Sequence, residues 1–410
     1  MSTLKKNILS MSVLQIGNSI IPLITIPYLT RVLGTFGFGQ IAFVQAVIAF
    51  LIMFVEFGFG MSAAAKIAEN QKDKIVVSRI FFAAWAVQFI IFIILLITFL
   101  ILINYIPRLE QARTLFLISL IGFFGNFLSP YWLLQGLEKM SGIVITQLVV
   151  RVLSIPAIFI FVDSQNDANI AILINALVMF LSGVFFLYWV HSKRLLCPVV
   201  LAWKDVRTAL IESSYYFFSR ISTSTYTNSI SMVIGFIVNQ QNYAYFSIAD
   251  KVRLAFQTSI SPIGAAVYPR ICFLYRTSVP DALKLLMRSG FLLVGLSIFS
   301  TFFIFIFAEK IILIVAGEKF LDATHILKIT AFLPAITSLS YVFGMQFLIP
   351  RGFIMHVNIT TFVVGSFTLA IAFPITKVYS VIGASYLMVI AEIIISSTFM
   401  IIFLKKKANI

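Results

Sequence analysis

The stretch IFFAAWAVQFIIFIILLITFLIL, from Ile80 to Leu102, contains no charged side chain. An α-helix rises about 1.5 Å per residue, so a run of this length can cross the roughly 30 Å hydrocarbon core of a bilayer. Basic residues stand on both sides of it, at Lys74, Arg79 and Arg108. The stretch therefore predicts a transmembrane helix.

Apolar runs of similar length recur along the whole chain. The others are Ile8–Val32, Gln40–Ala63, Leu115–Leu134, Ile143–Val162, Ile170–Val190, Phe217–Val238, Tyr243–Val267, Leu285–Phe307, Ile329–Leu348, Ile354–Phe373 and Val381–Leu404. Each is long enough to span the bilayer once. The sequence therefore predicts an all-α integral membrane protein with about twelve transmembrane helices.

The composition excludes a water-soluble globular protein. Of the 410 residues, 60% are hydrophobic and only 11% are charged, and the mean hydropathy is +1.04. A soluble domain carries about a quarter charged residues, so this chain must use lipid as its solvent. The 43 Phe residues agree with this, because a helix that faces lipid can be apolar on all sides.

The net charge of +15 does not indicate nucleic-acid binding. Such binding needs the basic residues on one folded surface, whereas here they lie between the apolar runs. Most Lys and Arg residues fall on the side that also holds both termini, and cytoplasmic connections are rich in these residues. We therefore expect a multi-pass membrane protein with both termini in the cytoplasm.

The longest connection between apolar runs divides the chain into two halves. We expect an N-terminal lobe of six helices over residues 1–190, a cytoplasmic connection over 191–216 and a C-terminal lobe of six helices over 217–410. Two lobes of equal size are typical of transporters, in which a central cavity lies between the repeats.

Charged side chains inside the predicted spans mark this cavity, because a charge in lipid costs several kcal/mol unless it meets water or a partner. The cations are Arg31, Arg151, Arg220, Lys251 and Arg253, and the acids are Glu56, Asp250 and Glu392. The cations outnumber the acids, so we predict a net positive cavity whose cations bind the substrate.

Two of these cations have alternative interpretations. Asp250 and Arg253 are three residues apart on one predicted helix and can neutralise each other, whereas Lys251 points about 100° away from Asp250. Arg220 can extend along the helix to reach the cytoplasmic interface. Lys251 is therefore the better candidate for contact with a ligand.

The seventh run is rich in hydroxyl groups, which favours a water-filled cavity. Thr225, Tyr226 and Asn228 are candidate contacts for a polar ligand in it. The alternative for the hydroxyls is a hydrogen bond back to a carbonyl of the same helix. The acids Glu56 and Glu392 are candidates for ion coupling, with the alternative that each is a structural partner of a buried Arg.

Catalytic and cofactor motifs are absent from the sequence. It has no phosphate-binding G-x-x-x-x-G-K-[ST] loop, no H-E-x-x-H and no Cys/His cluster with the spacing of metal ligands. We therefore expect neither enzymatic activity, nor a metal, nor a cofactor.

Three segments resemble the polysaccharide transporter family, which contains the Wzx-type O-antigen flippases. They are PYLTRVLG at 27–34, PYWLLQGLEKM at 130–140 and YFSIADK at 245–251. The family often has Asp where this chain has Tyr131. The resemblance implies two six-helix lobes around a central cavity, as in the wider superfamily of multidrug, oligosaccharidyl-lipid and polysaccharide exporters.

The resemblance also implies a function and partners. The substrate would be an undecaprenyl-pyrophosphate-linked glycan, an O-antigen-type repeat unit moved from the cytoplasmic to the periplasmic leaflet of the bacterial cytoplasmic (inner) membrane by alternating access. Thr225, Tyr226 and Asn228 would then contact its sugars. The candidate partners are membrane lipid, an O-antigen polymerase and a chain-length regulator. Two alternatives stay open: a cation-coupled exporter of small amphiphiles, and a membrane-embedded glycan polymerase or acyltransferase.

Overall fold

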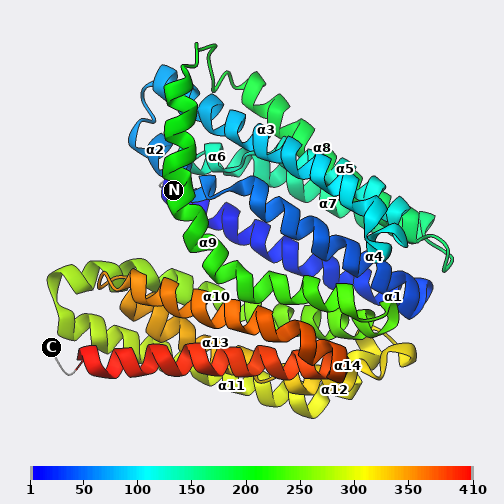
Figure 1. Cartoon of the computed structure of the whole chain (residues 1–410). Helices are drawn as coiled ribbons and strands as arrows, with labels where there is room; N and C mark the ends of the chain where they lie inside the picture. Colours follow the sequence, from blue (N-terminus) through cyan, green and yellow to red (C-terminus); the bar gives the residue numbers. More distant parts are fainter. Residues whose placement is uncertain (1–2, 408–410) are drawn as a thin grey trace. The chain divides into compact units, whose positions relative to one another are not determined.

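The computed structural model describes the backbone of residues 3–407. Within this range it describes the side chains of all residues except 3–20, 22, 23, 141–143, 145, 146, 218–228 and 407. The chain divides into two compact units, Met1–Arg220 and Ile221–Ile410. No strand occurs in residues 3–407, which are helical apart from short connections (Figure 1).

Unit 1 contains eight helices. They are α1 (Thr3–Glu56), α2 (Phe59–Glu69), α3 (Lys74–Tyr105), α4 (Pro107–Glu110), α5 (Arg113–Phe127), α6 (Trp132–Gly136), α7 (Ser141–Phe161) and α8 (Ala168–Ser192). Helix α9 (Trp203–Ile237) begins in unit 1 and continues into unit 2.

Unit 2 contains the remaining elements. They are α10 (Gln240–Thr277), α11 (Val279–Val315), the short 3₁₀ turn η1 (Glu318–Phe320), α12 (Ala323–Thr330), α13 (Leu333–Ser340), the π-helix η2 (Tyr341–Leu348) and α14 (Ile354–Lys407).

Two of the helices are too long for one membrane crossing, and each is broken by one residue with positive φ. Gly34 breaks α1 at φ 65° and ψ −171°, and Ser380 breaks α14 at φ 53° and ψ −150°. In three other places, consecutive helices join into one longer segment. The part of α1 after its break joins α2, α5 joins α6, and α12 joins α13 and η2. Within residues 3–407 these breaks and joins group the helices into twelve segments, six before α9 and six from α9 onward.

The length and composition of the helices agree with a membrane protein. In the described part of the chain, seven stretches are long and apolar enough to span a bilayer. In α3 the side chains of Phe89, Ile94, Ile97 and Ile101 are exposed on the model surface. So many exposed large apolar side chains on one helix are typical of a lipid-facing surface.

Small residues allow the closest helix contact in unit 1, between α5 and α8. A Cβ atom on Gly125 would lie 2.3 Å from the Cα atom of Phe180, and one on Gly183 would lie 2.3 Å from the carbonyl oxygen of Gly125. Both positions therefore exclude a side chain. Glycine at such contacts lets membrane helices gain packing that the surrounding lipid cannot supply.

Three helix boundaries differ from the predicted apolar runs. Helix α9 begins at Trp203, 14 positions before Phe217, because its first turns carry charged and polar residues and so lie outside any apolar run. Helix α10 continues to Thr277, and α11 begins after a single intervening residue, Ser278. Hydropathy locates the part of a helix that lies in lipid and not the part that extends beyond it.

Candidate functional site

A polar hollow of about 270 Å³ lies inside unit 1, between α5, α6, α7 and α8. Its polar lining consists of Asn126, Ser129, Tyr131, Gln147, Arg151 and Ser182. Gln147 and Arg151 are four residues apart on α7, so they lie on the same face of that helix. The Tyr131 hydroxyl is close enough to Arg151 for the two groups to interact electrostatically.

This arrangement suits an anionic ligand. A guanidinium group presents several N–H donors in a plane and can bind two oxygens of one phosphate or carboxylate group. The Asn126 and Gln147 amides add donors and acceptors that a sugar or a phosphate can use. The half-buried Arg151 is therefore placed among groups that can bind a charged head group.

In unit 2, helix α10 carries an ion pair between Asp250 and Arg253. The Oδ1 atom of Asp250 accepts hydrogen bonds from Nε and Nη2 of Arg253 at 2.9 Å and 2.6 Å. Nη1 of Arg253 donates to Oε1 of Gln257 at 2.5 Å. Arg253 is only 8% exposed, and the Asp250 carboxylate compensates its charge while Gln257 accepts a further hydrogen bond.

Lys251 is half-buried on the same helix. Successive residues of a helix point about 100° apart, so the ammonium group leaves α10 on a different side from the Asp250 carboxylate. Arg253 and not Lys251 forms the ion pair with Asp250.

The sequence PYLTRVLG at 27–34 lies on α1 and ends at the break at Gly34. The Tyr28 hydroxyl donates to the carbonyl oxygen of Val162 at 2.8 Å, which joins α1 to the end of α7. Nη1 of Arg31 donates to the carbonyl oxygen of Pro27 at 2.7 Å. Arg31 is exposed and does not line the hollow around Arg151. Gly34 supplies the positive φ that ends the segment.

The second segment packs α6 against α2. Trp132, Leu133 and Leu134 belong to the buried core of unit 1. A Cβ atom on Gly136 would lie 2.7 Å from the Ala64 carbonyl oxygen, so only glycine fits there. The sequence of this segment is thus explained mainly by packing, and Tyr131 is the member that also lines the Arg151 hollow.

Four of the predicted site residues lie outside the described side chains. They are Arg220, Thr225, Tyr226 and Asn228, all within 218–228 of helix α9. Their roles as cation and sugar contacts stay predictions.

The predicted ion-coupling acids lie in different units. Glu56 is the last residue of α1 and is half-buried. Glu392, on α14, is 2% exposed, and its Oε1 atom accepts a hydrogen bond from Ser340 at 2.5 Å. Ser340 also contacts the Ser396 hydroxyl at 2.6 Å. Among the described residues, no three His, Cys, Asp or Glu side chains lie close enough together to hold a metal ion.

Several polar residues beside the predicted charged residues were not predicted from the sequence. Gln147 and Gln257 each lie four residues from a predicted cation, and this i, i+4 spacing is a signal that the sequence contained. Ser340 and Glu392 are 52 residues apart, and only the packing of α13 against α14 brings them together.

The chain is similar over most of its length to proteins of a known family. A family model described as "Polysaccharide biosynthesis protein" matches residues 4–274. A protein of Escherichia coli (strain K12) named "Putative O-antigen transporter" is 30% identical over 401 residues, which cover 96% of this chain and 95% of that protein. A protein of the same name from Shigella dysenteriae is 28% identical and covers 96% of this chain and 98% of that protein.

Two solved structures share the fold at low sequence identity. An inward-facing multidrug resistance MATE family transporter of the MOP superfamily has a TM-score of 0.75 at 15% identity, with 95% of each chain covered. The lipid II flippase MurJ in its inward closed conformation has a TM-score of 0.73 at 14% identity, with 96% of this chain and 86% of that chain covered.

Proposed function

This chain belongs to the family of polysaccharide biosynthesis proteins, and from this premise we propose that it is a flippase for a lipid-linked glycan. The substrate is a polyprenyl-pyrophosphate-linked oligosaccharide of the O-antigen type, moved from the cytoplasmic to the outer leaflet. Support comes from the two relatives that each cover 96% of the chain, because both carry the name "Putative O-antigen transporter".

The observation that carries the proposal is the hollow around Arg151. Pyrophosphate cannot leave water without cations or hydrogen-bond donors to replace its hydration. The hollow offers a guanidinium group, two amides and several hydroxyls. Lys251 in unit 2 is the second proposed phosphate contact. Arg31, Arg220 and Arg253 stay sequence-based predictions for the substrate-binding cations.

The fold is shared with a multidrug transporter, which keeps the export of small amphiphiles as the second candidate function. A pocket for cationic amphiphiles requires a surplus of acids. The hollow around Arg151 has no acidic residue in its lining, and the net charge of the chain is +15. Both features favour an anionic substrate.

The function can be tested in the organism that carries the gene. Deleting the gene should remove O-antigen from the cell surface and leave lipid-linked repeat units on the cytoplasmic leaflet, and a plasmid copy should restore export. Arg151→Gln and Lys251→Gln should each reduce export at least about 10-fold, because a lost charge-assisted contact costs about 1.5–3 kcal/mol. Lys251→Arg should retain part of the activity, since it keeps the charge.

Lys377→Gln is the matched control, because Lys377 is an exposed lysine of α14 outside the proposed contacts. Its export should equal that of the wild type at equal protein level. Normal export by Arg151→Gln and Lys251→Gln, singly and together, would show that these cations do not bind the pyrophosphate.

For the energy source, we propose that Glu392 carries the coupling ion. A carboxyl group that is 2% exposed on a predicted membrane-spanning helix and hydrogen-bonded to the Ser340 hydroxyl is costly to keep for packing alone. Glu392→Gln keeps the shape and a hydrogen bond to Ser340 but cannot exchange a proton or bind a cation as a carboxylate does. It should abolish transport against a gradient and leave the exchange of substrate at equilibrium intact.

Proteoliposomes can separate these two activities, and Glu309→Gln, at an exposed acid of α11, is the control. If Glu392→Gln retained gradient-driven transport, the Glu392 carboxylate would be a structural partner only. Glu56 would then be the remaining candidate for ion coupling.

A further inference from the structure

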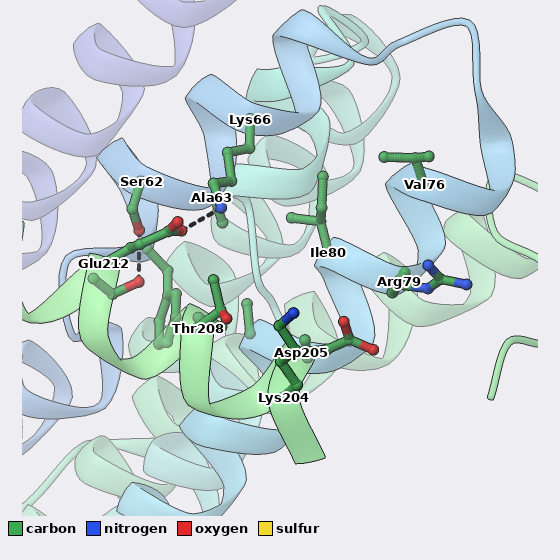
Figure 2. Close-up of a pocket in the computed structure, with 15 residues that line it drawn as sticks. Ser62, Ala63, Lys66, Val76, Arg79, Ile80, Lys204, Asp205, Thr208 and Glu212 are labelled. Atoms are coloured by element: carbon green, nitrogen blue, oxygen red, sulfur yellow. Dashed lines mark hydrogen bonds and ion pairs between the residues drawn. The ribbon is translucent and has the colours of Figure 1, made fainter. Parts of the chain in front are cut away.

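A second hollow lies at the end of unit 1 where α3 begins, between α2, α3 and the first turns of α9 (Figure 2). Its volume is about 290 Å³. A Lys66–Glu212 ion pair and a 2.7 Å hydrogen bond between the Ser62 and Ser213 hydroxyls join α2 to α9 along one side. In Figure 2 the side chains of Arg79 and Lys204 lie away from this ion pair.

The length of α3 places this hollow at the level of the lipid head groups. The helix has 32 residues and so is about 48 Å long, which exceeds the roughly 30 Å core of a bilayer. Its apolar run begins at Ile80, so the turns up to Arg79 extend beyond the hydrocarbon. Trp203, the first residue of α9, is 74% exposed, and exposed Trp is typical of the interface between membrane and water.

The charges around the hollow are unequal. Of its two acids, Glu212 is paired with Lys66, and Asp205 accepts a hydrogen bond from the Ala202 N–H at 3.1 Å. Among the residues that the structure describes, Arg79 and Lys204 form no ion pair. Both are exposed and line the hollow, whose three cations Lys66, Arg79 and Lys204 exceed its two acids by one positive charge.

The deeper part of the lining is apolar. Phe59, Ala63, Ile80, Ala83 and Ala84 form it, and Ala83 is only 3% exposed. The hollow therefore combines two cations with an apolar floor that continues toward the hydrocarbon region. A phosphate group with an acyl chain attached has the complementary chemistry, and a free phosphate would leave the floor uncovered.

We propose that this hollow binds an anionic phospholipid of the surrounding membrane, with the phosphate between Arg79 and Lys204 and the start of an acyl chain against Ile80 and Ala83. The net positive charge favours phosphatidylglycerol over a zwitterionic lipid, whose ammonium group would meet the same two cations. The bound lipid would join α3 to the first turns of α9, the helix that continues into unit 2. This inference does not depend on which molecule the protein transports.

Native mass spectrometry of the full-length protein in detergent tests the proposal, with phosphatidylglycerol, phosphatidylethanolamine or undecaprenyl phosphate added. Wild type should bind phosphatidylglycerol in preference to phosphatidylethanolamine. The double variant Arg79→Gln/Lys204→Gln should bind phosphatidylglycerol about 30-fold more weakly, which corresponds to two lost contacts between a basic side chain and an anionic lipid. Both side chains are exposed, so the variant should fold normally.

Two further variants make the result specific. Lys72→Gln/Lys193→Gln removes the same charge near the start of α3 but outside the hollow, and it should bind like wild type. Ala83→Leu fills the floor and keeps the cations, and it should also weaken binding. The proposal is wrong if the Arg79/Lys204 variant binds as the control does, if phosphatidylethanolamine binds equally well, or if equimolar undecaprenyl phosphate displaces phosphatidylglycerol from the wild type.

Discussion

Arg253 illustrates at the residue scale why the charge of a side chain does not by itself define its role. Its spacing of three residues from Asp250 predicts a pair, and the structure shows that pair with a further bond to Gln257. A buried cation held on both sides makes a stable local unit and has little charge left for a ligand. Arg151 differs, because its neighbours in the hollow are amides and hydroxyls.

Gly136 allows the sharpest prediction for a single residue. A methyl group at this position would lie 2.7 Å from both the Ala64 carbonyl oxygen and the Ile67 Cβ atom. Gly136→Ala should therefore lower the free energy of unfolding by about 1–3 kcal/mol, the usual cost of overpacking. The measurement is thermal unfolding of the purified protein in detergent.

Gly60→Ala is the matched control, because a Cβ atom there meets nothing within 4 Å. It should leave the stability equal or slightly higher, since alanine favours helix formation over glycine. If both variants unfolded at the wild-type temperature, the close contact between α6 and α2 would not be present in the protein.

At the element scale, the two long helices α1 and α14 are broken by the same backbone conformation, at a glycine in α1 and at a serine in α14. Gly34 and Ser380 both combine a positive φ with a ψ near ±150–180°, a region that is accessible almost only to glycine. Glycine is the residue expected for this conformation, and it stands at the first break as Gly34. At the second break, Ser380 adopts the conformation at the cost of backbone strain. The Ser380 hydroxyl does accept a hydrogen bond of 3.3 Å from the Asn242 amide, which offsets part of the cost.

We predict that Ser380→Gly stabilises the protein by about 1 kcal/mol, because it removes the strain at a position where φ is positive. Ser385→Gly, five residues further along the regular part of α14, should have the opposite effect by a similar amount. Thermal unfolding of the two variants side by side provides the measurement. A destabilised Ser380→Gly protein would mean that the hydrogen bond outweighs the backbone strain.

Elements also show where sequence analysis succeeds and where it fails. The α3 helix follows from its apolar run, because lipid imposes both a length and a composition. The first turns of α9 could not be predicted, because they are polar and are stabilised by contacts of Ser213 and Glu212 with distant residues of α2. The Ser340–Glu392 bond depends in the same way on tertiary packing, whereas Arg151 and Lys251 could be located from the sequence alone.

At the scale of the whole molecule, the number of segments constrains the topology. If each of the twelve segments crosses the membrane once, both ends of the chain lie on the same side. The distribution of Lys and Arg predicts that this side is the cytoplasm. A phosphatase that is active only outside the cytoplasm should be silent when it is fused after Ile410. The same reporter fused after Ser380, between the last two segments, should be active. The reverse pattern would overturn the predicted orientation.

The most direct test of the account is the movement of the substrate itself. Purified protein would be reconstituted into liposomes that contain an undecaprenyl-pyrophosphate-linked oligosaccharide with a fluorescent label, and a reductant that cannot cross the membrane would then be added outside. We predict that wild type exposes the label of both leaflets to the reductant, whereas the Arg151→Gln/Lys251→Gln protein and empty liposomes lose only the label of the outer leaflet. If wild type left the inner-leaflet label intact, the chain would not be a flippase for this class of lipid, and if the double variant matched wild type, the cations would not contact the head group.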